Sequence, residues 1–314
     1  MVKNILITGG CGFIGSNFIN HFHQRYPDCM IINYDKVDYC SNPDYIKNKE
    51  HNYVLVRSDL NNTHILMTTL KSYQIDTVIH FAAQSHVDNS FGNSIQFTID
   101  NILGTHNLLE CCRVYGNIKK FIHISTDEVY GEVDINHEGC TEKSLLNPTN
   151  PYAATKAGAE FLVKSYYYSY KLPIIITRGN NVYGPGQYPE KLIPKFITSL
   201  LKNEKCTIHG QGESRRNFIY VDDVSEAVET ILFYGQIGHT YNIGTNNEYS
   251  VLEVFDILSN KLDKSKDLKD FVEDRLFNDY RYSINSESLR SLGWKEKINF
   301  DEGLEKTIEW IKNN

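Results

Sequence analysis

A glycine-rich turn close to the N-terminus constrains the fold of this chain more strongly than any other feature of its sequence. The letters TGGCGFIG at 8–15 follow an apolar run and open an amphipathic stretch, so they predict a strand, a tight turn and a helix. Gly9, Gly12 and Gly15 permit the tight turn and let the backbone approach a pyrophosphate closely. The free N–H groups of the following helical turn favour an anion there. The stretch therefore predicts a dinucleotide-binding turn.

An acidic residue at the end of the second predicted strand supports the same interpretation. Asp35 lies 20 residues after Gly15, where a carboxylate is suited to bind the ribose hydroxyls of a dinucleotide. A negative charge there repels the additional phosphate of NADP, so the sequence favours NAD, although the neighbouring Lys36 weakens that inference. A glycine-rich turn that binds nothing is the less favoured alternative.

Short apolar runs alternate with longer amphipathic stretches through the first half of the chain. The predicted strands are 4–8, 30–34, 53–57, 77–81, 119–125 and 173–178, and the predicted helices between them are 13–26, 63–73, 94–115 and 152–170. Strands that read as continuous apolar runs between helices indicate a parallel sheet covered on both faces. We therefore expect an α/β fold with a doubly wound parallel sheet of the Rossmann type, which binds ligands at the carboxyl ends of its strands.

The character of the sequence changes after position 178. A loop rich in Gly, Asn and Pro is followed by shorter elements, with helices predicted at 192–202, 222–234, 251–261 and 300–313. We therefore expect an NAD-binding Rossmann domain over 1–178, completed by segments near 216–244, and a smaller α/β substrate-binding lobe made mainly by 179–314.

Length, charge and cysteine content exclude several classes of protein. With 314 residues, 41% of them hydrophobic, the chain has enough apolar material for about two packed domains. Its formal net charge of −7 argues against nucleic acid as the main partner, and no apolar run is long enough for a membrane span. Seven cysteines without a CxxC pair indicate reduced thiols in a cytoplasmic protein, and the histidines show no metal-binding spacing.

Two groups of polar residues follow the later strands. Tyr152 and Lys156 form a YxxxK pair on one predicted helix face, where an ammonium lowers the pKa of a phenol and lets it remove a proton from a sugar hydroxyl. Thr126, Asp127 and Glu128 come directly after the fifth predicted strand, at the end of the sheet where catalytic groups belong. Two carboxyls in different environments can act as base and acid, as a β-elimination requires.

With these groups in place, the sequence resembles a known family. TGGCGFIG at 8–15, STDEVYG at 125–131 and YAATK at 152–156 are similar to the extended short-chain dehydrogenase/reductase superfamily, and within it to the nucleotide-sugar 4,6-dehydratases. The similarity runs nearly end to end, through the segments FAAQSHVDNS (81–90), NNVYGPGQYPEKLIPKF (180–196), RRNFIYVDDV (215–224), YNIG (241–244) and DRLFNDYRY (274–282). Related epimerases and decarboxylases share the glycine turn and the YxxxK pair, so the acid pair carries most of the resemblance to the dehydratases.

The resemblance implies a lyase, a hydro-lyase that uses NAD to dehydrate a nucleoside-diphosphate glucose. Tyr152, assisted by Lys156 and Thr126, would remove the proton of the glucose 4-hydroxyl while a hydride passes from C4 to NAD. Glu128 would then abstract the C5 proton, and Asp127 would protonate the departing C6 hydroxyl. Return of the hydride to C6 would give the 4-keto-6-deoxy sugar nucleotide, with NAD retained throughout turnover.

The resemblance also implies which residues bind the two ligands. Those expected at the cofactor are Gly9, Gly12, Phe13, Ile14, Gly15, Asp35, Lys36, Asp38, Asp59, Leu60, Ala82, Ala83, Tyr152 and Lys156. Those expected at the substrate are Ser85, Asn181, Glu190, Lys191, Leu192, Arg216, Asn242, Arg275 and Asn278. Arg216 and Arg275 suit the diphosphate, because a guanidinium donates paired hydrogen bonds to phosphate oxygens. No metal is implied.

The motifs favour uridine over thymidine as the base of the substrate. Bacterial dTDP-glucose dehydratases typically carry AAESHVDRS and DRPGHDRRY, whereas the corresponding places here hold Gln84, Asn89, Leu276, Phe277 and Asn278. The segments RGNNVYGPGQYPEKLIPKF and DRLFNDYRY resemble instead the UDP-glucose 4,6-dehydratase part of plant rhamnose synthases. We therefore expect UDP-glucose as the substrate, with dTDP-glucose next, in a deoxysugar pathway of the rhamnose type.

The sequence leaves alternatives for the reaction and for the oligomeric state. A nucleotide-sugar 4-epimerase needs the glycine turn and the YxxxK pair but no acid pair, and a non-catalytic NAD-binding scaffold needs only the dinucleotide site. By analogy with relatives, the helices predicted at 94–115 and 152–170 would pack across a two-fold axis as a homodimer, but internal packing would explain their apolar faces equally well.

Overall fold

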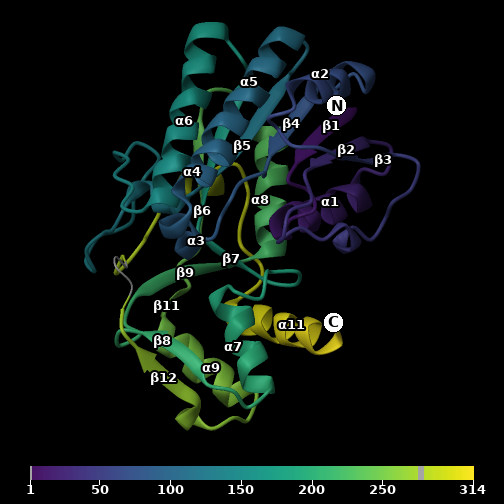
Figure 1. Ribbon diagram of the computed structural model, residues 1–314. Coiled ribbons are helices and arrows are strands. Elements are labelled where there is room, and N and C mark those ends of the chain that lie inside the picture. Colours follow the sequence, from purple (N-terminus) through teal and green to yellow (C-terminus); the bar gives the residue numbers. More distant parts are fainter. Residues whose placement is uncertain (1, 275–278) are drawn as a thin grey trace.

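The fold is built around a seven-stranded parallel sheet with the strand order β10-β6-β5-β4-β1-β2-β3 (Figure 1). The computed structural model describes residues 2–274 and 279–314. The strands of this sheet are β1 (Asn4–Thr8), β2 (Met30–Asp35), β3 (Tyr53–Arg57), β4 (Thr77–His80), β5 (Lys120–Thr126), β6 (Ile174–Gly179) and β10 (Thr240–Ile243). The order 3-2-1-4-5-6, with β10 added at one edge, is that of doubly wound dinucleotide-binding folds, so the predicted fold class is confirmed.

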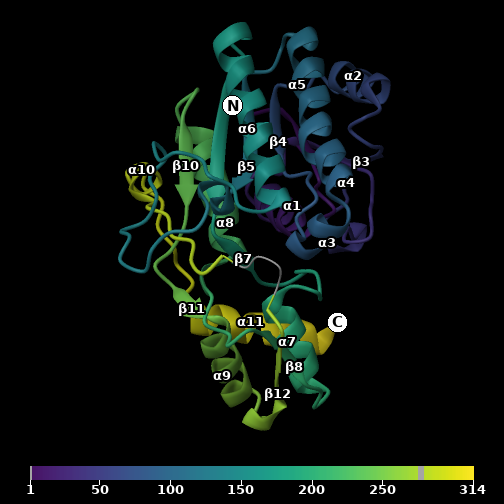
Figure 2. The same cartoon turned by 60° about the vertical axis from the view of Figure 1, so that its left-hand side comes forward.

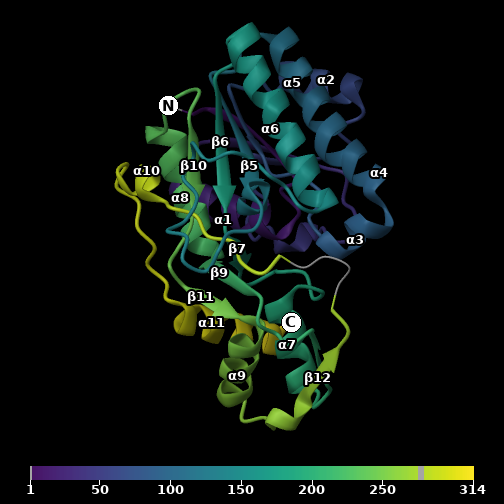
Figure 3. The same cartoon turned by 90° about the vertical axis from the view of Figure 1, so that its left-hand side faces the viewer.

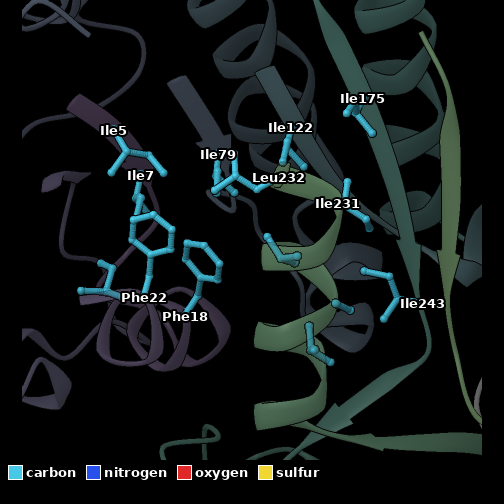
Figure 4. Packing of buried hydrophobic residues seen from close by; sticks show 14 of the residues in the cluster. Ile5, Ile7, Phe18, Phe22, Ile79, Ile122, Ile175, Ile231, Leu232 and Ile243 are labelled. Carbon is cyan, nitrogen blue, oxygen red and sulfur yellow. The ribbon is translucent and has the colours of Figure 1, made fainter. Parts of the chain in front are cut away.

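Helices cover both faces of this sheet. They are α1 (Phe13–Arg25), α2 (Thr63–Ser72), α5 (Gly104–Tyr115), α6 (Pro151–Tyr170) and α8 (Val221–Tyr234). Phe18 and Phe22 of α1 and Ile231 of α8 point towards the strands and form one half of the core (Figure 4). α2, α5 and α6 pack against the opposite face and form the other half. Because the strands are buried on both sides, they consist of the continuous apolar runs that made them predictable.

A smaller lobe lies at the carboxyl ends of the main strands. Its elements are β7 (Asn181–Tyr183), α7 (Leu192–Leu201), β8 (Cys206–His209), β9 (Arg215–Tyr220), β11 (Glu248–Ser250), α9 (Val251–Lys261), β12 (Lys269–Val272) and α11 (Phe300–Asn313). β9 pairs with β7 and β11, and β8 pairs with β12, around a core that contains Phe196, Phe255 and Leu304. Figure 3 shows β7 and β9 between the main sheet and the end of the lobe formed by α9 and β12.

The chain returns from this lobe to the main sheet. α8 packs against α1, and β10 pairs in parallel with β6, so that Thr240 faces Ile176 across the ladder. The short helix α10 (Glu287–Arg290) contacts β10 on the outer edge of the sheet (Figure 2). Segments from the second half of the sequence therefore close the far edge of the Rossmann sheet.

The prediction of one continuous helix over 94–115 is wrong, because the middle of this segment is a different kind of helix. It consists of α4 (Ser94–Phe97), a π-helical turn η2 (Thr98–Leu103) and α5. Asn101 explains the widened turn: its amide oxygen accepts from the backbone N–H of Gln84 at 2.7 Å, and its amide nitrogen donates to the hydroxyl of Thr155 at 2.9 Å. These bonds hold the turn against α6 and the loop after β4, as π-turns near functional sites often do.

Several short elements were not predicted. They are η1 (Pro43–Tyr45), α3 (Val87–Gly92), η3 (Asp127–Tyr130), η4 (Lys266–Leu268), α10, the edge strand β10 and all strands of the smaller lobe. Of these, η3 matters most for function, because it carries the two predicted catalytic acids.

Candidate active site

One cavity lies where the carboxyl ends of the parallel strands meet the smaller lobe. All of the predicted cofactor-binding residues and all of the predicted catalytic residues line it, from the glycine turn after β1 to the start of α6. Its wall continues into the smaller lobe through Gln187, Tyr188 and Lys191. Dinucleotides bind at this end of a doubly wound sheet.

The glycine turn fits a pyrophosphate. Gly9 has a φ of 71°, and a Cβ on it would lie 2.5 Å from the backbone nitrogen of Ala82. A Cβ on Gly15 would overlap the carbonyl oxygen of Gly9, so the turn closes only with glycine at both positions. Gly12 is the N-cap of α1 and provides no side chain, which leaves the first N–H groups of the helix available to an anion at the cavity.

Asp35 and Lys36 lie at the end of β2 in the same wall. The Asp35 carboxylate accepts hydrogen bonds from the backbone N–H groups of Cys11 at 2.9 Å and Val37 at 2.7 Å, which fixes its orientation at the cavity. The Lys36 ammonium lies 2.8 Å from a carboxylate oxygen of Asp100. The sequence analysis did not predict this partner, which comes from the widened turn η2.

The turn η3 presents the acid pair directly after β5. Thr126 is its N-cap, and the Thr126 hydroxyl accepts from the backbone N–H of Glu128 at 3.3 Å. Asp127 is buried and accepts from the side-chain amide of Asn180 at 2.8 Å. Glu128 faces the cavity and accepts from the side-chain amide of Asn150 at 3.0 Å. Each acid therefore has its own amide donor from a different element.

The environment of the acid pair favours the protonated form of both groups. Burial, together with the negative charge of Glu128, raises the pKa of Asp127 to about 7, although the Asn180 amide opposes this. Burial also raises the pKa of Glu128, and the Asn150 amide opposes the rise. Asp127 is thus divided between its acid and its carboxylate near neutral pH, which suits a group that donates a proton and recovers it.

The Tyr–Lys pair differs from its prediction. Burial and the charge of Glu128 raise the pKa of Tyr152, so in the protein alone the phenol is neutral rather than activated by its lysine. Lys156 directs its ammonium to the carbonyl oxygen of Ile124, at 2.6 Å. Burial lowers the pKa of Lys156 to about 8, although the charge of Glu160 opposes this. Burial of the phenol, followed by the charges of the two neighbouring carboxylates, dominates its pKa, and sequence spacing reveals neither.

The predicted substrate-binding residues divide into those in the cavity and those beside it. Ser85, Asn181 and Lys191 line the cavity, and the Lys191 ammonium donates to the carbonyl oxygen of Ser85 at 2.8 Å. Glu190 pairs with a histidine at 3.6 Å and Leu192 begins α7, both next to the cavity rather than in its lining. The Lys191 ammonium therefore lies between the two lobes, at the end of the cavity where the substrate is expected.

The remaining predicted substrate residues have different positions. The Arg216 guanidinium lies over the ring of Tyr282, 4.6 Å from its centroid, and its positive charge acts on both catalytic acids. Asn242 does not reach the cavity: it is fully buried on β10, where its amide nitrogen donates to the carbonyls of Cys140 and Asn285. Its prediction as a substrate ligand thus receives no support. Arg275 and Asn278 lie outside the described residues.

Sequence reasoning missed a buried network behind the cavity. Arg178 on β6 and Glu160 on α6 form a buried ion pair at 2.6 Å. Arg178 also donates to the hydroxyl of Tyr130 at 2.7 Å, and Tyr130 is the last residue of η3. A charged residue within an apolar strand was the signal available in the sequence, because such a charge requires a buried partner.

Two further observations concern the described part of the chain as a whole. Within residues 2–274 and 279–314, no group of three His, Cys, Asp or Glu side chains is placed to hold a metal ion. Over the same residues, no helix has the length and apolar character needed to cross a bilayer.

Three features define the class of this protein: the sheet order, the glycine turn after β1 and the YxxxK pair one helical turn apart. They are those of the short-chain dehydrogenases/reductases. The second lobe places the chain in the extended branch of that class. The acid pair after β5 narrows this class further. The chain belongs to the family of nucleotide-sugar 4,6-dehydratases described as GDP-mannose 4,6 dehydratase, whose model matches residues 6–307.

Individual relatives agree with this assignment. A trifunctional UDP-glucose 4,6-dehydratase/UDP-4-keto-6-deoxy-D-glucose 3,5-epimerase/UDP-4-keto-L-rhamnose-reductase of Arabidopsis thaliana is 50% identical over 319 residues, which cover 99% of this chain and 48% of the plant protein. The chain thus spans about half the length of such plant relatives. A dTDP-D-glucose 4,6-dehydratase of Dictyostelium discoideum is 46% identical, over 100% of this chain and 82% of its own. The crystal structure of a dTDP-glucose 4,6-dehydratase from Streptomyces venezuelae with NAD and TYD bound has a TM-score of 0.95 at 36% identity, and the match covers 99% of this chain and 98% of that one.

Proposed function

We propose that this chain is a hydro-lyase that converts a nucleoside-diphosphate glucose to its 4-keto-6-deoxy derivative, with NAD as a retained cofactor. The observation that carries the proposal is the acid pair, Asp127 and Glu128, in one cavity with Tyr152 and Lys156. Elimination of water needs a base for a carbon-bound proton and an acid for the departing oxygen. A pKa of about 7 at Asp127 keeps much of that group protonated near neutrality, as the acid role requires.

NAD is the cofactor that suits the dinucleotide end of the cavity. The glycine turn would hold the pyrophosphate, and Asp35 would hold the ribose hydroxyls. The charge of Lys36 is already balanced by Asp100 at 2.8 Å and Asp38 at 3.2 Å, so it offers little to the additional phosphate of NADP. When bound, NAD supplies the acceptor and later the donor of a hydride, and it brings a positive charge into the cavity. We further propose that 1–178, with segments near 216–244, form the part that binds it.

Oxidation at C4 assigns the first proton transfer to Tyr152. Tyr152 acts as the phenolate, having released its own proton to solvent, and takes the proton of the 4-hydroxyl as the C4–O bond becomes a carbonyl; the Lys156 ammonium stabilises the phenolate beforehand. Contact with the Thr126 hydroxyl favours the phenolate as well. A positive charge in the cavity opposes the burial and the two carboxylates that otherwise keep the phenol neutral.

Elimination assigns one role to each acid. The new 4-ketone acidifies the C5 proton, and Glu128, oriented by the Asn150 amide, abstracts it. Asp127 gives its proton to the C6 oxygen, so the C6–O bond breaks and water leaves. Glu128 then returns a proton to C5 as C6 receives the hydride that C4 gave up, and Asp127 regains a proton as Tyr152 releases the one it took. The net change is the loss of one water.

UDP-glucose is the substrate we propose first, with dTDP-glucose second, for a deoxysugar pathway of the rhamnose type. The named activities of the plant relatives and the motifs shared with them support uridine, whereas the Dictyostelium relative is named for the thymidine nucleotide. Parallel turnover of the two nucleotides, with the product read by mass, tests the preference. A higher kcat/KM for dTDP-glucose would reverse it.

The alternatives are a 4-epimerase and a non-catalytic NAD-binding scaffold. A variant Glu128→Gln should still oxidise C4 but form the dehydrated product at least about 100-fold more slowly, because it lacks the C5 base. The exposed Glu204→Gln is the matched control. For the unmodified protein, a product of unchanged mass would favour the epimerase, and no conversion of either nucleotide would favour the scaffold. Normal dehydration by Glu128→Gln would contradict the role of Glu128 as the C5 base.

We also propose a cytoplasmic homodimer. Phe161 and Tyr168 are 60% and 71% exposed on one face of α6, and Leu103 and Val114 are exposed beside α6 on η2 and α5. Internal packing buries Tyr152 and Tyr166 of the same helix but not these four side chains, and a second copy of the chain would cover them. Light scattering should give twice the chain mass, and Phe161→Glu should halve it.

The seven free cysteines of the described chain suit a reducing compartment.

A further inference from the structure

Asn150 joins the acid pair to the helix that carries the Tyr–Lys pair. It is buried, with 6% of its surface exposed, and it is the N-cap of α6. Its side-chain oxygen accepts from the backbone N–H of Ala153 at 2.8 Å, and its side-chain nitrogen donates to a carboxylate oxygen of Glu128 at 3.0 Å. A backbone N–H can only donate and a carboxylate only accepts, so this orientation of the amide is the one that satisfies both partners.

This position gives one side chain two separable functions. As an N-cap followed by Pro151, it fixes the start of α6 at Pro151, one residue before Tyr152. As an amide donor, it holds the Glu128 carboxylate 22 positions earlier in the sequence. Ser and Asp are also good N-caps, but neither can accept from the helix and donate an amide N–H to the carboxylate at the same time.

We propose that Asn150 is a positioning residue for the elimination step, which aims the Glu128 carboxylate at the C5 proton. This inference rests on the proposed function and adds a residue to it. Burial raises the pKa of Glu128, so without a donor this side chain would tend to be protonated and free to rotate. An N–H donor from a fixed helix end opposes both tendencies without adding a charge to the cavity.

The inference separates the two halves of the reaction. C4 oxidation depends on Tyr152, Lys156 and Thr126, whereas breaking the C5–H bond requires Glu128 to receive that proton. Loss of a hydrogen bond to a charged group lowers a rate that depends on it by about 10- to 100-fold. We therefore expect loss of the Asn150 amide to slow proton removal from C5 by that factor and to leave C4 oxidation within about threefold.

The test compares Asn150→Ser, which keeps the cap and loses the amide, with Asn150→Ala, which loses both, in full-length protein loaded with NAD. Asn299→Ser is the matched control, because Asn299 caps α11 through the N–H of Glu302 at 2.9 Å, in the smaller lobe. Single turnovers are quenched, and the sugar nucleotide that has been oxidised but has not lost water is separated from the dehydrated product by mass. Thermal midpoints are recorded for every variant.

We expect both Asn150 variants to accumulate the oxidised, undehydrated sugar and to release the dehydrated product about 10- to 100-fold more slowly. Only Asn150→Ala should also lower the thermal midpoint, and Asn299→Ser should change neither rate. Normal dehydration by Asn150→Ser would overturn the inference and leave Asn150 as a helix cap. An equal loss of C4 oxidation and dehydration would overturn it too. If the unmodified protein dehydrates neither nucleotide, the proposed function itself fails, which is a different result.

Discussion

Replacing Asp127 by Asn should stabilise the protein while it abolishes the proposed elimination. Asp127 is buried with 2% of its surface exposed, and it accepts an amide bond from Asn180. An asparagine at this position can turn its own amide oxygen towards Asn180, so the hydrogen bond is kept. The other carboxylate oxygen accepts from the Thr126 hydroxyl at 3.3 Å, and that hydroxyl can turn to accept from the asparagine NH2 instead. The substitution therefore removes an ionisable group from the interior while its polar atoms keep their neighbours.

The direction of the effect follows from where the proton is bound. Burial and the charge of Glu128 raise the pKa of Asp127 to about 7, from an ordinary value of 3.8. Between about pH 4 and pH 7 the native protein retains a proton that the unfolded chain has released, so the free energy of unfolding falls as the pH rises through this window. A difference of about three between the two pKa values corresponds to about 4 kcal/mol once the pH exceeds both.

The advantage of Asp127→Asn should therefore grow with pH. We expect it to be about 1–2 kcal/mol near pH 5 and up to about 4 kcal/mol near pH 8, measured by urea unfolding without added NAD. The exposed Asp44→Asn is the control and should show no such slope. An advantage that is absent, or that does not change between these two pH values, would refute the assignment of Asp127 as the buried acid of elevated pKa.

Two further substitutions test other parts of the structure. Gly15→Ala should reduce NAD affinity at least about tenfold in a fluorescence titration, because its Cβ would overlap a carbonyl oxygen of the glycine turn. Arg178→Met should lower the free energy of unfolding by about 3–5 kcal/mol, because it leaves the Glu160 charge buried and unpaired. The double variant with Glu160→Met should recover much of that loss in the same urea experiment, and an additive loss would contradict the ion-pair explanation.

The Rossmann part of the fold was predictable because its signals are local. β1 and β3 begin and end at the predicted residues, since each is an apolar run bounded by polar or turn residues. α6 begins one residue before its predicted start, where Asn150 and Pro151 form an ordinary N-terminal signal. The glycine turn and the acids after β5 were placed correctly for the same reason: their position relative to a strand end can be read directly from the sequence.

The smaller lobe was less predictable because its strands depend on partners far away in the chain. β7 and β11 are three residues long, and neither shows an alternation that distinguishes it from a loop. In the described part of the chain, β8 pairs with β12, with Cys206 opposite Lys269. The pKa of Tyr152 was mispredicted for a related reason, because the spacing to its lysine is local whereas the burial and the carboxylates that dominate are not.

Two polar links join the two catalytic elements, η3 and α6, and their positions predict what each link does. At the cavity the link is the amide of Asn150 on Glu128, and behind it the link runs from Tyr130 through Arg178 to Glu160. The second link is fully buried and charged, so it sets how the two elements pack. With the link through Tyr130, Arg178 and Glu160 intact, loss of the Asn150 hydrogen bond should leave η3 and α6 in place and release only the Glu128 carboxylate. We therefore expect the effects of Asn150→Ser to appear in one chemical step, and those of Arg178→Met to appear in folding.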